Sequence, residues 1–361
     1  MSFLSNTKNK VSTGDRFIDL FPTPRFLEMP APGLAFDSNS IRIVEFNKTR
    51  KGLVIKNYGQ ETIPPGAISD GDITDPTNLI NLLKEVKKKY GLNHVRCALP
   101  EEKSYLFRGR VPKTSSVAEL RTSVEFIIEE NVPLSVSEAV FDYFVIEDPS
   151  LETNDTLDVA VSVVPRDLVE SYVSILNSAG LSPLHFEIES QAIAKAVVKK
   201  GDKTPYLLIN LFDRKIGIYV VSQEAIQFAS TLPLTERPER KGEKIESEGE
   251  KQMTSKTSPI DIDIPIEEVK SETNKIISYW NSQSERLGSD KIPIETAVLS
   301  GKGADSKKLS RDLSFLNMKI RAADVWTNAF SLEDYIPSLP KNESLEYVVA
   351  VGLAIPNRPR S

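Results

Sequence analysis

The sequence contains few of the residues from which metal sites, disulfides and nucleophilic catalytic sites are usually built. Its 361 residues include one cysteine, Cys97, and two histidines, His94 and His185. A single cysteine cannot form an intramolecular disulfide, and we interpret Cys97 as a small buried apolar residue of a protein from a reducing compartment. Neither histidine has a cysteine or histidine at ligand spacing or belongs to a recognisable Ser/His/Asp arrangement. The sequence therefore predicts no metal site and no catalytic residue of these kinds.

Long apolar runs and an excess of positive charge are missing as well. No stretch reaches the roughly 18 uninterrupted apolar residues of a membrane-spanning helix, and the N-terminal residues MSFLSNTKNKVSTGDRF lack the apolar core of a signal peptide. Acidic residues outnumber basic ones by 51 to 45, and the formal net charge is −6. Because proteins built to hold nucleic acid usually present a basic face, we expect no nucleic-acid partner. We expect a cytoplasmic protein.

Folded sequence is predicted to begin at Gly33. Residues 1–32 are polar and punctuated by proline, and we interpret them as a flexible tail. The tail includes FIDLF, for which a short helix that touches a membrane or a partner is the alternative. GLAF, the turn DSNS and IRIVEF predict a strand, a tight polar turn and a return strand, and GLVIKNYG continues the hairpin. DPTNLINLLKEVKKKYG has apolar residues at helical spacing and a final glycine, so it predicts a helix.

The next part of the chain, residues 104–187, predicts a small α+β unit. SYLFRGRVP, AVFDYFVIE and LDVAVSVV predict strands. Ser116 and Glu119 form a capping-box pair ahead of one amphipathic helix, and Pro165 and Gly180 bound a second. We expect both helices to pack on one small sheet.

A third unit begins at Pro205. PYLLINL, RKIGIYVV and AIQFASTLP predict three strands, and a long helix, the strand IETAVLS and the turn GKGA follow further on. The intervening residues 235–261 are charged and have almost no large apolar side chain. Such a segment cannot bury enough surface to offset chain ordering, so we predict a disordered loop.

The strand-turn-strand pattern of GLAFDSNSIRIVEF returns in PYLLINLFDRKIGIYVV, and SGKGA adds a third loop between a strand and a helix. This layout is similar to the actin-like fold, an α/β class with a duplicated ribonuclease-H-like core. ALPEEKSYLFRGRVP, VEFIIEENVPLSVSEAVFDYFVI and VESYVSILNSAGLSPLHFEIESQAIAKA resemble an inserted SHS2-type small domain and its exit helix, and the final YVVAVGLAI also fits. From Gly33 to Pro356 the sequence resembles the PilM family of type IV pilus assembly proteins, relatives of the cell-division protein FtsA.

The resemblance implies a division of the chain into domains. Residues 33–103 would form the first half of the actin-like core, completed by a helix at 188–200 and the C-terminal segment 345–357. Residues 104–187 would form the inserted domain. Residues 205–344 would form the second half of the core, with the charged loop 235–261 inside it.

The resemblance also locates three loops that would hold ATP. The family's first phosphate loop usually reads like GIDIGSSSIK, whereas GLAFDSNSIR has Ala35 at the acidic position, Asp37 at the second glycine and Arg42 in place of lysine. The second usually reads like VDIGAS, whereas INLFDR has Asn210 for aspartate and Phe212 for glycine. The adenosine loop SGGGA is SGKGA here. If nucleotide binding is retained, the implied ATP-binding residues are Ser38, Asn39, Ser40, Asn210, Gly301, Lys302 and Gly303.

The substitutions remove much of the chemistry that ATP–Mg needs. Magnesium prefers carboxylate ligands, and Ala35 offers no oxygen while Asn210 offers a neutral one. Phe212 would hinder the approach of backbone to phosphate, and Asp37 would repel a triphosphate by on the order of 1 to 4 kcal/mol, which Lys302 could partly offset. We predict a degenerate nucleotide site without a metal site or catalytic residues. Glu189, in the exit helix, has two open interpretations: it orients a water, or it is a surface carboxylate without a partner.

The resemblance implies a scaffold function. PilM-like proteins are thought to hold the cytoplasmic N-terminal peptide of the membrane protein PilN between the core and the inserted domain, among other pilus platform proteins at the inner face of the cytoplasmic membrane. Arg108–Val111 and AVFDYFVIE are candidates for this contact by position. The alternative is an active actin-like ATPase that binds ATP–Mg and cycles or polymerises during pilus assembly. A membrane-tethered polymer of the FtsA kind is disfavoured, because two prolines in LAIPNRPRS interrupt a terminal helix.

Overall fold

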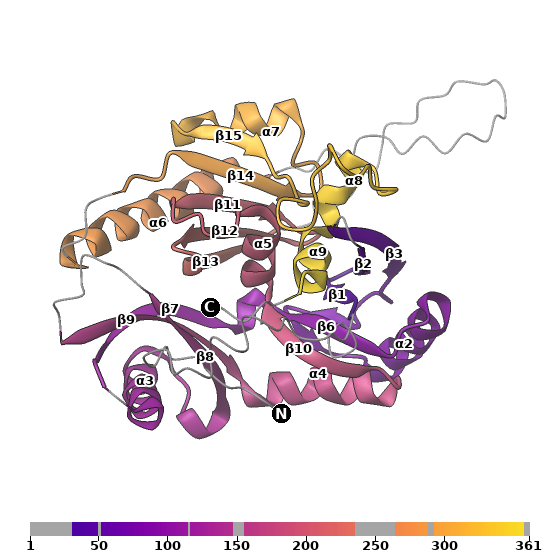
Figure 1. Ribbon diagram of the computed structural model, residues 1–361, viewed down its shortest axis with the longest axis horizontal. Coiled ribbons are helices and arrows are strands. Elements are labelled where there is room, and N and C mark those ends of the chain that lie inside the picture. Colours follow the sequence, from indigo (N-terminus) through magenta and orange to yellow (C-terminus); the bar gives the residue numbers. More distant parts are fainter. Residues whose placement is uncertain are drawn as a thin grey trace, which may run out of the picture.

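A computed structural model describes residues 31–49, 52–114, 116–146, 155–234, 264–287 and 292–356. These residues form two five-stranded sheets, a three-stranded sheet and a small two-stranded one, with helices around and between them (Figure 1). Most of the predicted tail, residues 1–30, and the predicted charged loop, 235–261, lie outside the described residues. None of the described helices is long and apolar enough to span a membrane.

The first large sheet forms around the predicted N-terminal hairpin. Its strands are β1 (Gly33–Phe36), β2 (Ser40–Thr49), β3 (Gly52–Thr62), β6 (His94–Leu99) and β10 (Ser182–Ile188), in the order β10-β6-β1-β2-β3. Strand β1 is antiparallel to β2 and parallel to β6. Helix α2 (Pro76–Tyr90) buries Leu79, Leu83 and Val86, and the short strands β4 (Ile68–Ser69) and β5 (Asp72–Ile73) precede it.

The second large sheet repeats this topology. Its strands are β11 (Tyr206–Leu211), β12 (Lys215–Ser222), β13 (Ala225–Pro233), β14 (Thr296–Gly301) and β15 (Lys319–Ala322), in the order β13-β12-β11-β14-β15. Strand β11 is antiparallel to β12 and parallel to β14, as β1 is to β2 and β6. Helix α6 (Ile266–Leu287) occupies the chain position of α2. The predicted duplication of an α/β core is therefore confirmed.

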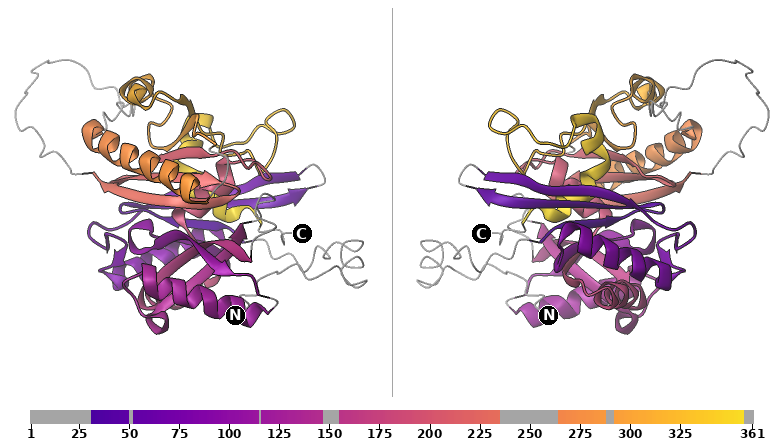
Figure 2. Two further views of the ribbon diagram at one scale, coloured as in Figure 1. Left: turned by 90° about the vertical axis from the view of Figure 1, so that its left-hand side faces the viewer. Right: turned by 90° about the vertical axis from the view of Figure 1, so that its right-hand side faces the viewer.

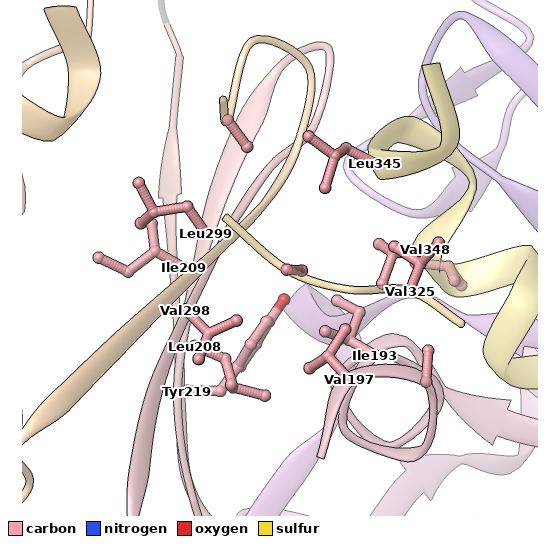
Figure 3. Packing of buried hydrophobic residues seen from close by; sticks show 14 of the residues in the cluster. Ile193, Val197, Leu208, Ile209, Tyr219, Val298, Leu299, Val325, Leu345 and Val348 are labelled. Carbon is pink, nitrogen blue, oxygen red and sulfur yellow. The ribbon is translucent and has the colours of Figure 1, made fainter. Parts of the chain in front are cut away.

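Two helices cross between the two large sheets. Helix α5 (Glu189–Val197) follows β10, and α9 (Val348–Ala354) follows α8 (Lys341–Ser344) and the 3-10 turn η6 (Leu345–Tyr347). A Cβ atom at Gly352 would lie 1.8 Å from the carbonyl oxygen of Ala192, so the helices approach this closely only because residue 352 is glycine. Figure 3 shows Ile193 and Val197 of α5 directed toward Tyr219 and Leu208 of the second sheet.

The three-stranded sheet is formed by the middle of the chain. Strands β7 (Tyr105–Pro112), β8 (Ala139–Ile146) and β9 (Thr156–Pro165) are antiparallel in the order β7-β9-β8, so β7 and β8 are the edge strands. Helix α3 (Val117–Asn131) covers one face through Leu120, Val124 and Ile128. Figure 1 and the rotated views of Figure 2 show this unit below the second large sheet.

The predicted small unit is correct only in part. Helix α4 (Arg166–Ser178) contacts β8 and β9 of the small sheet, as predicted, but it also buries Leu168, Tyr172 and Ile175 in the core of the first half. Strand β10 pairs in parallel with β6 along residues 182–188, so the end of the predicted inserted domain 104–187 belongs to the first large sheet. The rest of the predicted division into domains stays a prediction.

Candidate functional site

The duplicated topology brings together the three loops that the sequence suggested as a nucleotide site. The turn after β1, the turn after β11 and the loop after β14 meet beside the start of α9. A cavity between them is lined by Ala35, Phe36, Asp37, Arg42, Asn210, Leu211, Phe212, Gly301, Lys302, Glu346, Val348 and Val349. Of the predicted site residues, Asn210, Gly301 and Lys302 line it, whereas Ser38, Asn39, Ser40 and Gly303 do not.

Arg42 forms ion pairs across this site. Its guanidinium lies 3.4 Å from Oδ2 of Asp37 through Nη1, and 3.1 Å from Oε2 of Glu346 through Nη2. Nη2 is also 3.8 Å from Oδ1 of Asp213, and the Arg42 side chain is only 8% exposed. Sequence comparison presented Arg42 simply as a replacement for lysine, and it did not reveal Asp213 or Glu346. Both partners are far away in the chain, so no local pattern could have identified them.

Asp37 accepts hydrogen bonds from the backbone of two loops. The N–H of Ser38 donates to Oδ1 of Asp37 over 2.7 Å, and the N–H of Asp213 donates to Oδ2 over 3.2 Å. The hydroxyl of Ser40 donates to Asp213 over 3.4 Å. Burial, followed by the nearby Asp37 carboxylate, raises the pKa of Asp213. The Asp37 carboxylate thus accepts hydrogen bonds from backbone N–H groups of the kind that bind anions in phosphate loops.

Two further predicted residues, Asn210 and Gly301, have packing partners within the protein. Asn210 Oδ1 accepts a hydrogen bond of 2.7 Å from the Ser300 hydroxyl, and both side chains are buried. Gly301 has φ of 87°, and a Cβ there would lie 2.1 Å from the carbonyl oxygen of Leu211. The glycine is therefore required by the approach of β14 to β11, whether or not a nucleotide binds.

Little space is left between these side chains. The cavity offers about 20 Å³ to the centre of a water-sized sphere. This is enough for about one water, whereas small-molecule sites typically enclose about 300 to 1,000 Å³. Phe212 is 6% exposed and contributes to this filling.

Of the two interpretations of Glu189 left open by the sequence, the structure contradicts one, and the water-orienting role stays a prediction. Glu189 is not a surface carboxylate, since it is 2% exposed and its Oε2 lies 2.7 Å from Nζ of Lys215. The same oxygen accepts a hydrogen bond of 3.1 Å from the backbone N–H of Glu101. Glu189 also lies outside the residues that line the cavity, so its contacts are with the protein and not with a nucleotide site.

The two segments suggested as peptide contacts lie on opposite edges of the small sheet. Strand alternation and the pairing register place their inward side chains in rows across β7, β9 and β8. One row is Arg110, Asp158 and Ile146, and the next is Arg108, Ala160 and Phe144. This face lies opposite α3 and is directed toward α5, because the Gln191 side chain donates to the Ser162 hydroxyl over 2.8 Å.

Asp158 fixes the two arginines of this face. Its buried carboxylate lies 2.7 Å from Nη2 of Arg108 and 3.2 Å from Nε of Arg110. The Nε atom of Arg108 is buried and has no hydrogen-bond partner among the described residues. Strand β13 lies alongside β7 at this face.

Two sheets of identical order, joined by α5 and α9 and with three loops meeting at one cavity, define an actin-like fold. The family model described as "Type IV pilus assembly protein PilM" matches residues 33–229. The chain belongs to this PilM family of type IV pilus assembly proteins.

A solved structure agrees with the fold, and a second is similar to it over most of its length. A PilM–PilN type IV pilus biogenesis complex matches with a TM-score of 0.64 at 16% identity, covering 90% of this chain and 98% of that chain. The ethanolamine utilization protein EutJ from Carboxydothermus hydrogenoformans matches with a TM-score of 0.42 at 13% identity, covering 90% and 89%. No curated protein matches the sequence.

Proposed function

We propose that this protein is a nucleotide-independent scaffold of the type IV pilus platform, which holds the cytoplasmic N-terminal peptide of a PilN-like inner-membrane protein. Membership of the PilM family supports the pilus role. The similarity to a protein solved as a PilM–PilN complex supports the choice of partner. The scaffold would act at the inner face of the cytoplasmic membrane, through PilN-like and other platform proteins.

Independence of nucleotide is supported by the way Asp37 and Arg42 occupy the loop junction. A phosphate loop binds its anion through backbone N–H groups, and here those of Ser38 and Asp213 donate to the Asp37 carboxylate. A bound triphosphate would have to displace this carboxylate and separate Arg42 from Glu346. The residues present therefore do not fit ATP–Mg, and Asn210 and Gly301 serve packing in this proposal.

Peptide binding is supported by the inward face of the small sheet. Ala160 is the small central member of its row, between the longer side chains of Arg108 and Phe144. An apolar peptide side chain can pack over Ala160, while guanidinium N–H groups donate to peptide carbonyls. Edge strand β7 or β8 can add main-chain hydrogen bonds, as in strand addition.

A titration with a synthetic PilN-like N-terminal peptide tests this proposal. We expect wild-type protein to bind it and Ala160→Leu to weaken binding at least about tenfold, because the added side chain fills the contact surface. Ala118→Leu, the same substitution on the exposed side of α3, is the matched control and should bind as wild type does. Absence of wild-type binding would contradict the proposal, and equal binding by Ala160→Leu would contradict this location.

The alternative is an ATPase that cycles or polymerises with ATP–Mg. Its support is the meeting of the three loops, with Gly301 retained in the third. A calorimetric titration with ATP, with and without magnesium, separates the two functions. Binding that strengthens with magnesium would favour the ATPase, whereas the scaffold proposal predicts no binding at high micromolar ATP.

A further inference from the structure

Four ionisable side chains meet where three parts of the molecule join. Glu101 and Glu102 belong to the 3-10 turn η2 (Glu101–Lys103) just before β7, Glu189 begins α5, and Lys215 begins β12. The Lys215 ammonium contacts the Glu102 carboxylate and lies 2.7 Å from Oε2 of Glu189. We call these four residues the carboxylate cluster. It joins β12, in the second half of the core, to the segment that leads into strand β7 of the small sheet.

The two buried glutamates hold each other's segments. The backbone N–H of Glu101 donates to Oε2 of Glu189 over 3.1 Å. In return, the backbone N–H of Ser190 donates to Oε2 of Glu101 over 2.9 Å, and the Ser190 hydroxyl lies 3.1 Å from Oε1 of Glu101. Each carboxylate therefore satisfies backbone donors at the start of the other's segment, so neither can leave without exposing unpaired groups.

The charges in the carboxylate cluster do not balance. Three carboxylates face one ammonium, and Glu101 and Glu189 are only 4% and 2% exposed. The other cation of η2, Lys103, is paired with Asp72 over 2.7 Å and adds only a weaker attraction to Glu102. Strand β12 adds the Tyr219 hydroxyl, the Phe212 ring lies 4.6 Å from the Lys215 ammonium, and β13 carries no ionisable residue. From α4, Tyr172 donates its hydroxyl to the carbonyl of Gly71. Full ionisation would bury uncompensated negative charge, which is strongly unfavourable.

A proton on Glu101 relieves this imbalance without a change of partners. The Ser190 hydroxyl can donate to an ionised Glu101 or accept from a protonated one. Burial raises the pKa of Glu101 to about 7. Burial, with added repulsion from Glu102 and Glu101, also raises the pKa of Glu189 despite the Lys215 ammonium.

We propose that the carboxylate cluster holds one proton at neutral pH, and that loss of this proton at mildly alkaline pH loosens the contact of β12 with η2 and α5. Repulsion among the three charged carboxylates would open the joint, because the single ammonium of Lys215 cannot neutralise all of them. Because η2 leads directly into β7, the joint controls how the small sheet is held against β13. The protein would thus be sensitive to pH at a joint that adjoins the turn after β11, since Lys215 follows this turn and its ammonium lies 4.6 Å from the Phe212 ring.

Backbone hydrogen exchange of the full chain tests this inference without any partner. Protection of η2 and the first turn of α5 is compared at about pH 6 and about pH 9, after correction for intrinsic exchange rates. We expect a loss of at least about tenfold at the higher pH, confined to the joint. Unchanged protection in the wild-type protein would overturn the proposal.

Two variants locate the proton. Glu101→Gln should remove the pH step, whereas Glu295→Gln, the same change at an exposed position, should retain it. Ser190→Ala keeps every charge but removes a hydroxyl that stabilises the ionised Glu101, so the step should move to higher pH. A full step in Glu101→Gln would overturn the proposal. Should that variant fail to fold, an unmoved step in Ser190→Ala would do the same.

Discussion

Replacing Arg42 with methionine tests whether the loop junction is held together by internal charges. The variant keeps an unbranched side chain about as long as the stem of arginine but removes the cation shared by Asp37, Asp213 and Glu346. The side chains of Asp37 and Asp213 are 5% and 13% exposed, so water can solvate them poorly once the cation is gone.

The expected cost follows from this burial. Removing one partner of a buried ion pair typically costs about 3 to 5 kcal/mol, because the other charge stays buried. The Glu346 side chain is 29% exposed, so water can partly solvate its charge once Arg42 is gone. We therefore expect Arg42→Met to lower the free energy of unfolding by about 3 kcal/mol, the lower end of this range. Arg121→Met is the matched control, since its ion pair with Glu125 joins side chains that are 60% and 32% exposed. Arg121→Met should lower the free energy of unfolding by less than about 1 kcal/mol, and this cost should become smaller in high salt.

Urea unfolding at neutral pH, followed by tryptophan fluorescence, to which the buried Trp326 contributes, measures these costs. A double-mutant cycle adds Asp37→Asn, which removes one of the carboxylates that Arg42 neutralises. The double variant should be more stable than the sum of the single effects predicts, by about 1 to 2 kcal/mol. An additive cycle, or an Arg42→Met variant as stable as wild type, would refute the idea that Arg42 acts as the internal cation of this site.

Three further predictions concern the rest of the molecule. Gly352→Ala should destabilise the protein by on the order of 3 kcal/mol in thermal unfolding, because the Cβ atom of the new alanine would collide with the carbonyl oxygen of Ala192. The pKa of Glu101 is raised from 4.5 to about 7 in the folded protein, so its contribution to stability is complete below about pH 4.5 and is lost as pH rises through 7. Urea titrations across pH should show this loss, about 3 kcal/mol, in the wild-type protein and not in Glu101→Gln. Ser116→Ala should leave thermal stability within about 0.5 kcal/mol, because its side chain caps nothing, whereas Asp75→Ala, which removes a working cap on Asn78, should cost about 1 kcal/mol.

The sequence predicted the parts of the fold that depend on local patterns. The hairpin of β2 and β3, helix α2 with its terminal Gly91 and the strands β11 to β13 follow from alternation, helical spacing and turn residues. The repetition of these patterns predicted the duplicated core. The capping box at Ser116 was wrong, since the Ser116 side chain makes no capping hydrogen bond although the residue does precede α3.

Interactions between distant residues could not be predicted in this way. Helix α4 has an amphipathic pattern that fits either sheet, and only the assembled molecule buries Tyr172 against the first half. Likewise, Glu189 carries no local sign that Lys215 and Glu101 will surround it. At the loop junction the substitutions were visible in the sequence, but the use of Asp37 as an acceptor for two loops was not.

The most direct test of a nucleotide-independent scaffold is one calorimetric experiment on the wild-type protein. The affinity for a PilN-like N-terminal peptide is measured with and without saturating ATP–Mg. The account predicts peptide binding with the same Kd in both conditions, and no heat when ATP–Mg is added alone. A Kd that changes about tenfold or more with ATP–Mg would show that the two sites are coupled through a bound nucleotide, and it would contradict the account.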